Sequence, residues 1–88
     1  MTAPPNVPVF NCVVNVGPTG EGVVVATVAN LAGMSGQGKS QREALAAVVT
    51  QFKAAMNQYH SAAQPIPWID PPTAPAAGQT QRLIAVHL

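Results

Sequence analysis

The alternation of apolar and polar residues predicts a β-strand near the start of the chain. In the run 9–16, apolar side chains occupy every second position, and Asn11 and Asn15 fall between them. Successive side chains of a strand point to opposite faces, so this run predicts one buried face and one polar face. A second β-branched run covers 23–28, and the stretch 17–22 between the two contains three glycines and a proline. We therefore expect an antiparallel hairpin. Its buried face would include Phe10, Cys12, Val14 and Val16.

The middle of the chain has the spacing of an amphipathic helix. Ser40 and Glu43 form a Ser-x-x-Glu capping box, in which the Ser40 hydroxyl would accept from the Glu43 amide and the Glu43 carboxylate from the Ser40 amide. Beyond the cap, apolar residues recur along one face, which predicts a helix that lies on a sheet. The helix should end between His60 and Ala63, because prolines follow. The apolar positions that recur at steps of three and four are Leu45, Val48, Val49, Phe52, Met56 and Tyr59.

The remaining segments have weaker patterns. Residues 34–38 predict a short third strand despite two glycines. The stretch 65–80 contains five prolines and no periodicity, which indicates an irregular connection. We expect Trp68 to tie its first half to the core and the second half to be looser. Residues 81–88 are expected to form the last strand, and residues 1–8, with three prolines, a flexible lead-in.

These elements predict one α+β domain over residues 9–88, with the order β-β-β-α-β. The hairpin, the short strand and the helix occupy 9–64, and the connection and the last strand follow. We expect a four-stranded mixed sheet with the amphipathic helix on one face. If the first three strands meander and the helix crosses back over the sheet, the last strand runs parallel to the first and third strands, and a right-handed crossover can place it beside the first.

Composition adds an expectation about assembly. Charged residues make up 8% of the 88-residue chain, against about 25% in an average globular domain. A weakly charged surface carries little repulsion against copies of itself, so we expect a homo-oligomer.

The charge and the single cysteine limit the partners and the compartment. A net charge of +1, from scattered residues, gives no basic surface for nucleic acid. No apolar stretch reaches the length of a membrane span, and the first residues lack the pattern of a signal peptide. Cys12 has no partner for an internal disulfide, which agrees with a reducing environment. We expect a cytoplasmic protein.

Catalytic and metal-binding interpretations are weaker than structural ones. Cys12 with His60 or His87 would suit a nucleophile and base or a zinc site, but its position among apolar residues favours a core thiol. The string 33–40 matches Gly-x-x-x-x-Gly-Lys-Ser of phosphate-binding loops, yet the chain is too short for the parallel sheet such proteins use. We expect no enzyme, no cofactor and no metal.

The connection contains a possible interface. Trp68 is the only tryptophan, and one interpretation is that it covers a small core. The alternative is that Ile66, Trp68 and Ile69 form an arm that packs on a neighbouring subunit or partner, where large apolar side chains concentrate binding energy.

Four features in this order resemble the N-terminal domain of the HicB antitoxin family. They are the hairpin, the segment 28–38 (VANLAGMSGQG), the helix start 40–45 (SQREAL) and the Pro-Ile-Pro at 65–67. The likeness covers about residues 9–69. It implies a degenerate ribonuclease-H-like sheet, oligomerisation, and neutralisation of a small HicA-like toxin that cleaves messenger RNA.

Two features qualify what this resemblance implies. The chain ends within its last strand at Leu88, where full antitoxins continue into a DNA-binding part, so direct DNA binding is not expected. A ribonuclease H centre needs carboxylates that converge on a metal ion, and the run 9–16 has none. We therefore expect a non-enzymatic HicB-like interaction domain. The alternative is a self-assembling or small-ligand-binding regulatory domain with no toxin partner.

Overall fold

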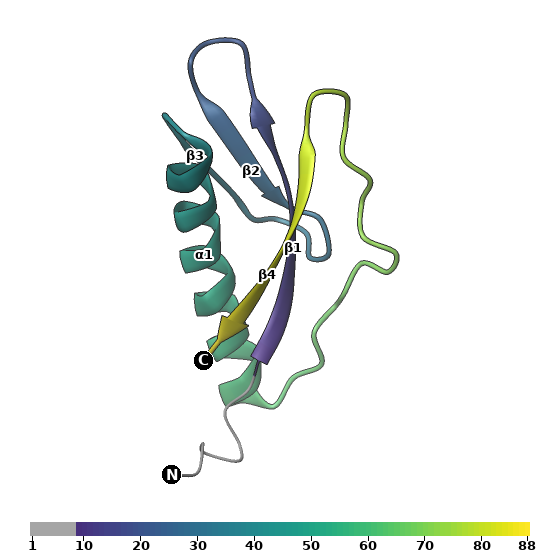
Figure 1. The fold of residues 1–88 in the computed structure, drawn as a ribbon. Coiled ribbons are helices and arrows are strands. Elements are labelled where there is room, and N and C mark those ends of the chain that lie inside the picture. The colour runs from purple at the N-terminus through teal and green to yellow at the C-terminus, as the bar shows by residue number, and fades with distance from the viewer. Residues whose placement is uncertain (1–8) are drawn as a thin grey trace, which may run out of the picture.

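The computed structural model describes residues 9–88, which form four strands and one helix in the expected order (Figure 1). The expected lead-in at 1–8 lies outside the described residues. The bounds differ from the expected ones by no more than two residues at every end. They are β1 Val9–Pro18, β2 Val24–Val28, β3 Ser35–Gly38, α1 Gln41–Ala62 and β4 Thr80–His87.

The strands form one sheet in the order β3-β2-β1-β4, and every neighbouring pair is antiparallel. The expected hairpin is confirmed, with β1 and β2 paired from Val14↔Val28 to Pro18↔Val24. β4 lies beside β1 as expected, but it runs from Thr80 opposite Val16 to His87 opposite Val9. The expectation of a mixed sheet with a parallel last strand is therefore wrong.

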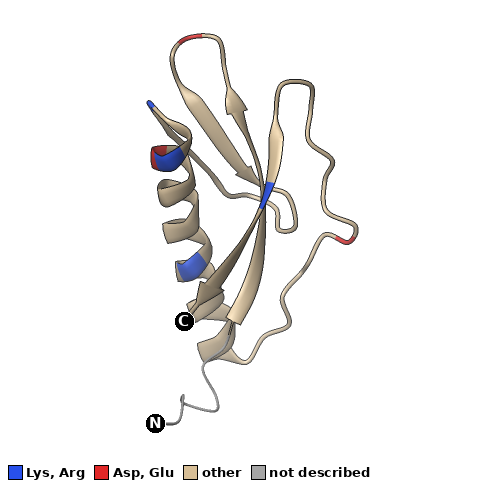
Figure 2. Cartoon of the chain, viewed as in Figure 1, with Lys and Arg blue, Asp and Glu red and all other residues tan. Residues whose placement is uncertain are grey.

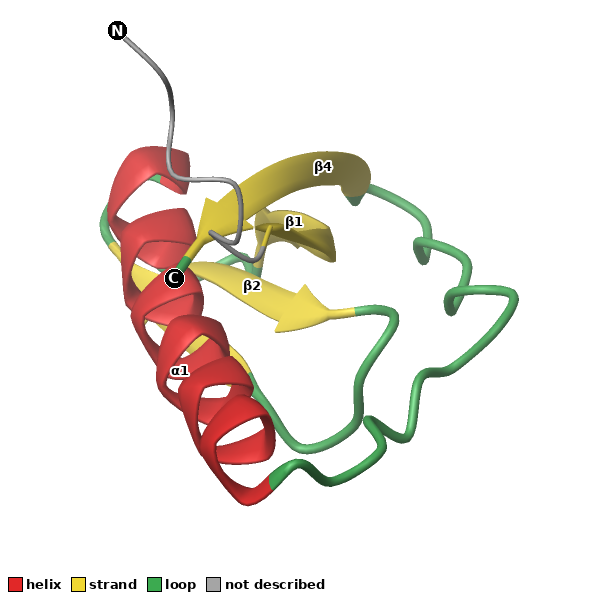
Figure 3. Ribbon diagram, turned by 90° about the horizontal axis from the view of Figure 1, so that it is seen from below, coloured by secondary structure: helices red, strands yellow, loops and turns green. Residues whose placement is uncertain are grey.

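The connection 63–79 explains why β4 runs antiparallel to β1 and not parallel to it as expected. α1 runs from the end of β3 toward the end of the sheet where β1 begins, so a strand that started directly after α1 would run parallel to β1 (Figure 1). Instead, the connection returns along the sheet on the side away from α1 (Figure 3). Backbone hydrogen bonds fix its path: the Ile69 amide donates to the Asn30 carbonyl and the Thr73 amide to the Ala29 carbonyl, both at 2.9 Å.

The core lies between α1 and one face of the sheet, as the two periodicities predict. From the helix, Val48, Phe52 and Met56 are completely buried, while Leu45 and Tyr59 are half-buried at the margin. Burial of such side chains is the main favourable contribution to folding a domain of this size. The sheet contributes Cys12, Val14, Val16, Ala26, Val28 and Val86 to the same cluster.

Two glycines of β3 let α1 lie close to that strand. A Cβ atom at Gly36 would lie 2.8 Å from both the Ala47 Cβ and the Val48 amide nitrogen, and one at Gly38 would overlap the Glu43 side chain. Gly36 and Gly38 of the string 33–40 therefore serve helix packing, whereas a Cβ at Gly33 would meet no atom within 4 Å. Half of that string is strand β3, so it does not form a phosphate-binding loop between a strand and a helix.

The helix cap differs in one detail from the expected box. The Glu43 amide donates to the Ser40 Oγ at 3.2 Å, which is the expected contact. The Glu43 carboxylate accepts from the amide of Lys39 at 3.3 Å, and not from that of Ser40. Both contacts satisfy polar groups where the helix begins.

Candidate interaction site

Asn30 joins three parts of the fold just beyond the end of β2. Its Oδ1 accepts from the Val13 amide at 3.1 Å, and its Nδ2 donates to the Asn11 carbonyl at 2.8 Å. The side-chain amide thus continues the β1 ladder where the backbone of β2 has turned away. Because the Asn30 carbonyl accepts from Ile69, the same buried residue also holds the connection. The sequence indicated only that a polar residue interrupts an apolar run here.

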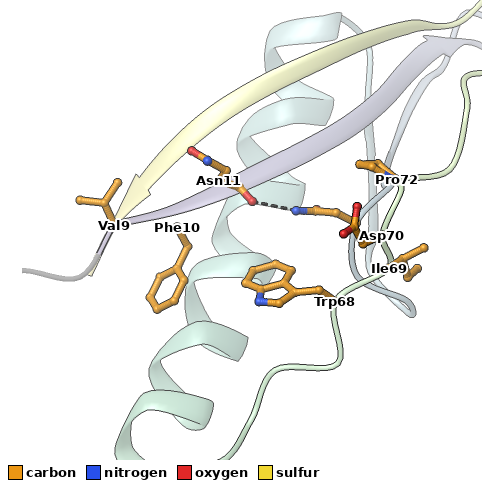
Figure 4. Close-up of a pocket in the computed structure, with 8 residues that line it drawn as sticks. Val9, Phe10, Asn11, Trp68, Ile69, Asp70 and Pro72 are labelled. Atoms are coloured by element: carbon orange, nitrogen blue, oxygen red, sulfur yellow. Dashed lines mark hydrogen bonds between the residues drawn. The ribbon is translucent and has the colours of Figure 1, made fainter.

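An open groove of about 410 Å³ lies beside this junction, between the first residues of β1 and the connection (Figure 4). Trp68 lies in it with its ring centroid 6.4 Å from that of Phe10 and 6.2 Å from that of Phe52. These distances are typical of packed aromatic pairs. The groove is lined by Val9, Phe10, Asn11, Asn30, Trp68, Ile69, Asp70 and Pro72.

The expected interface residues lie against their own chain. Ile66 is half-buried and packs on the core cluster. Trp68 covers Phe52, as the core interpretation proposes, but 41% of its surface stays exposed in the groove. The second half of the connection is tied as well, because the Thr73 carbonyl accepts from the Asn15 and Gln81 side chains at 2.9 and 3.1 Å. The connection is therefore also held at Thr73, where its second half begins.

A second candidate site is the free edge of β4. The Ala29 amide donates to the Val13 carbonyl at 2.6 Å, and Asn30 contacts Val13 and Asn11, so odd-numbered residues of β1 direct their backbone groups toward β2. The backbone groups of consecutive strand residues point to opposite sides. Even-numbered residues of β1 therefore face β4, and the register makes even-numbered residues of β4 face β1.

The odd-numbered residues of β4 consequently direct their N–H and C=O groups away from the sheet. These residues are Gln81, Leu83, Ala85 and His87. Among residues 9–88, no strand, loop or side chain hydrogen-bonds these backbone groups, and all four residues are exposed. The edge is thus a row of unpaired donors and acceptors that another strand could join.

The side chains of β4 do little to block such pairing. Leu83 is 68% exposed on the face away from α1. Natural proteins commonly protect an edge with prolines, lysines, bulges or covering loops, whereas β4 contains neither proline nor lysine. Its only charged residue is Arg82, whose guanidinium points toward α1 and lies 3.4 Å from the Gln41 Oε1.

This edge was missed by the sequence interpretation because the direction and register of β4 against β1 decide which of its backbone groups point outward. A parallel β4 would also have been an edge strand, but its outward groups and side chains would have been arranged differently. The available signal was the lack of lysine and proline in 80–87, which is unusual for a strand exposed along one side.

The residues considered for catalysis do not come together. Cys12 is completely buried, and burial raises the pKa of its thiol from 9.0 to about 11. His87 pairs with Val9, so its side chain lies on the opposite face of the sheet from Cys12, and His60 is exposed near the end of α1. Within residues 9–88, no group of three His, Cys, Asp or Glu side chains is arranged to hold a metal ion.

The three acidic side chains are separated over the fold (Figure 2). Glu21 lies in the turn between β1 and β2, Glu43 in the first turn of α1, and Asp70 in the connection. They are the only acidic side chains of the protein. The structure therefore gathers no acidic surface that would attract a strongly basic partner.

Comparison with protein families, curated proteins and solved structures finds no match. Within residues 9–88, no helix combines the length and the apolar character that crossing a bilayer requires.

Proposed function

We propose that this chain is a non-enzymatic interaction domain whose primary activity is self-association. The observation that carries the proposal is the exposed edge of β4, where unpaired backbone groups and the exposed Leu83 lie on a strand without lysine or proline. Protein surfaces with these properties are prone to pair with another strand.

The sparse charge of the chain supports the same function. The 88-residue chain has only seven acidic and basic side chains, and its net charge is +1. Long-range repulsion between two copies is therefore small, and association depends on local complementarity.

Molar mass in solution tests this function. Light scattering after size-exclusion chromatography, over a range of loading concentrations, should give a mass that is a multiple of 9.0 kDa. The mass should change little with salt, because few charges take part. A mass of one chain at every concentration would contradict the proposal.

The groove supports a second candidate, the binding of a small ligand or a partner segment. Trp68 offers an exposed aromatic surface there, beside the carboxylate of Asp70. A site with these groups suits a ligand with an apolar body and a positive charge. Because Trp68 is the only tryptophan, titration of candidate ligands should change its fluorescence directly. Trp68→Phe would remove the signal and serve as the control.

A HicB-like role would add a small HicA-like toxin as partner. The separated carboxylates do not favour a basic toxin, so self-association ranks first. Co-expression with a small basic protein of that kind, followed by purification through a tag on one of the two, tests the toxin interpretation. Co-purification in a fixed stoichiometry would rank the toxin interpretation first, and separate elution would remove it.

A further inference from the structure

We infer that two copies of this chain pair antiparallel through their β4 strands about a two-fold axis at Ile84, which joins two four-stranded sheets into one. This inference rests on the proposed self-association and names the surface and the register that produce it. The partner is a second copy of this chain, because the outward-facing residues of β4 can pair with the same residues of another β4 that runs antiparallel to it.

The positions of the free groups select the register. With Ile84 opposite Ile84 of the other copy, Leu83 lies opposite Ala85 and Gln81 opposite His87. In an antiparallel ladder, the residues next to a non-hydrogen-bonded pair form hydrogen-bonded pairs. All four outward-facing residues of each copy then have both of their backbone groups satisfied. Moving the axis to Leu83 or to Ala85 leaves one outward-facing residue of each copy without a partner residue in β4.

The side chains agree with this register. On the face away from α1, the exposed Leu83 of each copy would lie beside Ala85 of the other. On the face toward α1, the two Ile84 side chains would meet at the axis, where the cross-strand distance is shortest. Arg82 would lie opposite Val86 and not opposite the other Arg82, so the pairing places no like charges directly opposite one another.

The helix layer leaves room for the second copy. α1 packs mainly over β3 and β2 and touches β4 least of the four strands. In Figure 1, α1 lies at the β3 side of the sheet. Among residues 9–88, β4 is the last strand in the sheet order, and no element hydrogen-bonds to the backbone on its outer side. A strand can therefore approach β4 without displacing the helix or the connection.

A proline at position 85 tests the surface. The Ala85 amide points outward, so Ala85→Pro removes two intermolecular hydrogen bonds from the symmetric dimer and none from the ladder with β1. The dissociation constant should rise roughly 30-fold for the two lost bonds. The matched control Ala85→Thr keeps the amide and should leave the dimer intact. Sedimentation equilibrium measures both, and circular dichroism checks that each variant is folded.

A cysteine at position 84 tests the register without depending on the proline variant. Cα atoms of a non-hydrogen-bonded pair lie about 4.5 Å apart, which is within disulfide range. In a Cys12→Ala background, Ile84→Cys should form a covalent dimer under mild oxidation. In the same background, His87→Cys should not, because its two copies would lie roughly 20 Å apart.

The outcomes separate the inference from the proposed function. A dimer that persists in Ala85→Pro, or a cross-link that forms through position 87 and not 84, overturns the β4 pairing but leaves self-association in place. A wild-type chain that is monomeric at every concentration contradicts both. A proline variant that dissociates, with cross-linking at position 84 alone, supports both.

Discussion

The two edges of the sheet differ in length, composition and cover. β3 has four residues, two of them glycine, and α1 lies directly against it. The Gln51 side chain donates to the Ser35 carbonyl at 2.6 Å, so α1 also satisfies a backbone group of that strand. β4 has eight residues, and its outward groups have no partner within residues 9–88.

This difference follows from the small number of strands that a single helix can cover. A helix is about 10 Å wide and cannot cover four strands spaced about 4.8 Å apart. Here α1 covers the β3 side, and the β4 border has no cover within residues 9–88. A pair of copies would bring the two uncovered borders together and leave the two closed ones outside.

The largest expected effect on stability comes from a change at the closed edge, which is the β3 edge covered by α1. Gly36→Val should destabilise the fold by about 3 kcal/mol, because the added side chain would overlap Ala47 and Val48 and force α1 away from β3. Urea unfolding at fixed protein concentration measures this cost. Ala85→Val, the matched change on the open edge, should alter stability by less than about 0.5 kcal/mol. Equal losses of unfolding free energy at the two positions would contradict the claim that α1 packs closely on β3 and leaves β4 uncovered.

Asn30→Ala should lower the free energy of unfolding by about 2 kcal/mol. It removes the groups that satisfy the Val13 amide and the Asn11 carbonyl, and both point to the side of β1 where β2 no longer pairs with it. Asn30→Asp retains the acceptor for Val13 and should lie between alanine and the wild type. Thermal unfolding monitored through Trp68 fluorescence compares the three proteins. A neutral alanine variant would contradict the stabilising role of the Asn30 side chain at β1.

Cys12 should make stability depend on alkaline pH. Burial raises the pKa of the folded thiol to about 11, above its ordinary value of 9.0. The folded state therefore holds this proton more tightly, and its contribution to stability is fully present below pH 9 and falls as the pH rises from 9 to 11. Cys12→Ala should lack that part of the decline. Denaturation midpoints of the two proteins across this pH range should diverge, and parallel curves would contradict the assignment.

The smallest effect is expected at Gln51, on the closed edge. Gln51→Ala removes the cap from the Ser35 carbonyl, which is exposed, so water replaces the lost bond and the cost should stay below about 1 kcal/mol. The molar mass should not change, because β3 remains short and covered by α1. A higher mass for this variant would indicate that Gln51 is what prevents association through β3.

The sequence predicted each element because each has a local cause. Alternation marked β1, the stripe from Leu45 to Tyr59 marked the face of α1, and the Ser40 cap marked where the helix begins. The direction of β4 could not be predicted in the same way. It depends on the path of the connection, which is fixed by contacts of Ile69 and Thr73 with residues some forty positions earlier.

The candidate sites were predicted only in part. Trp68 was identified because it is a large apolar side chain in a proline-rich segment, and it lies in the groove. The free edge was not identified, because the side-chain pattern does not say which backbone groups of β4 point outward. Their freedom follows only from the register of Val9 to Val16 against β4.

Amide hydrogen exchange along β4 tests the β4 pairing most directly, because it reads the backbone groups themselves in the unaltered protein. At high protein concentration, the amides of Leu83 and Ala85 should exchange as slowly as those of Ile84 and Val86. On dilution, only the odd-numbered amides should lose protection. Fast exchange of Leu83 and Ala85 at concentrations where the protein is oligomeric would contradict the account.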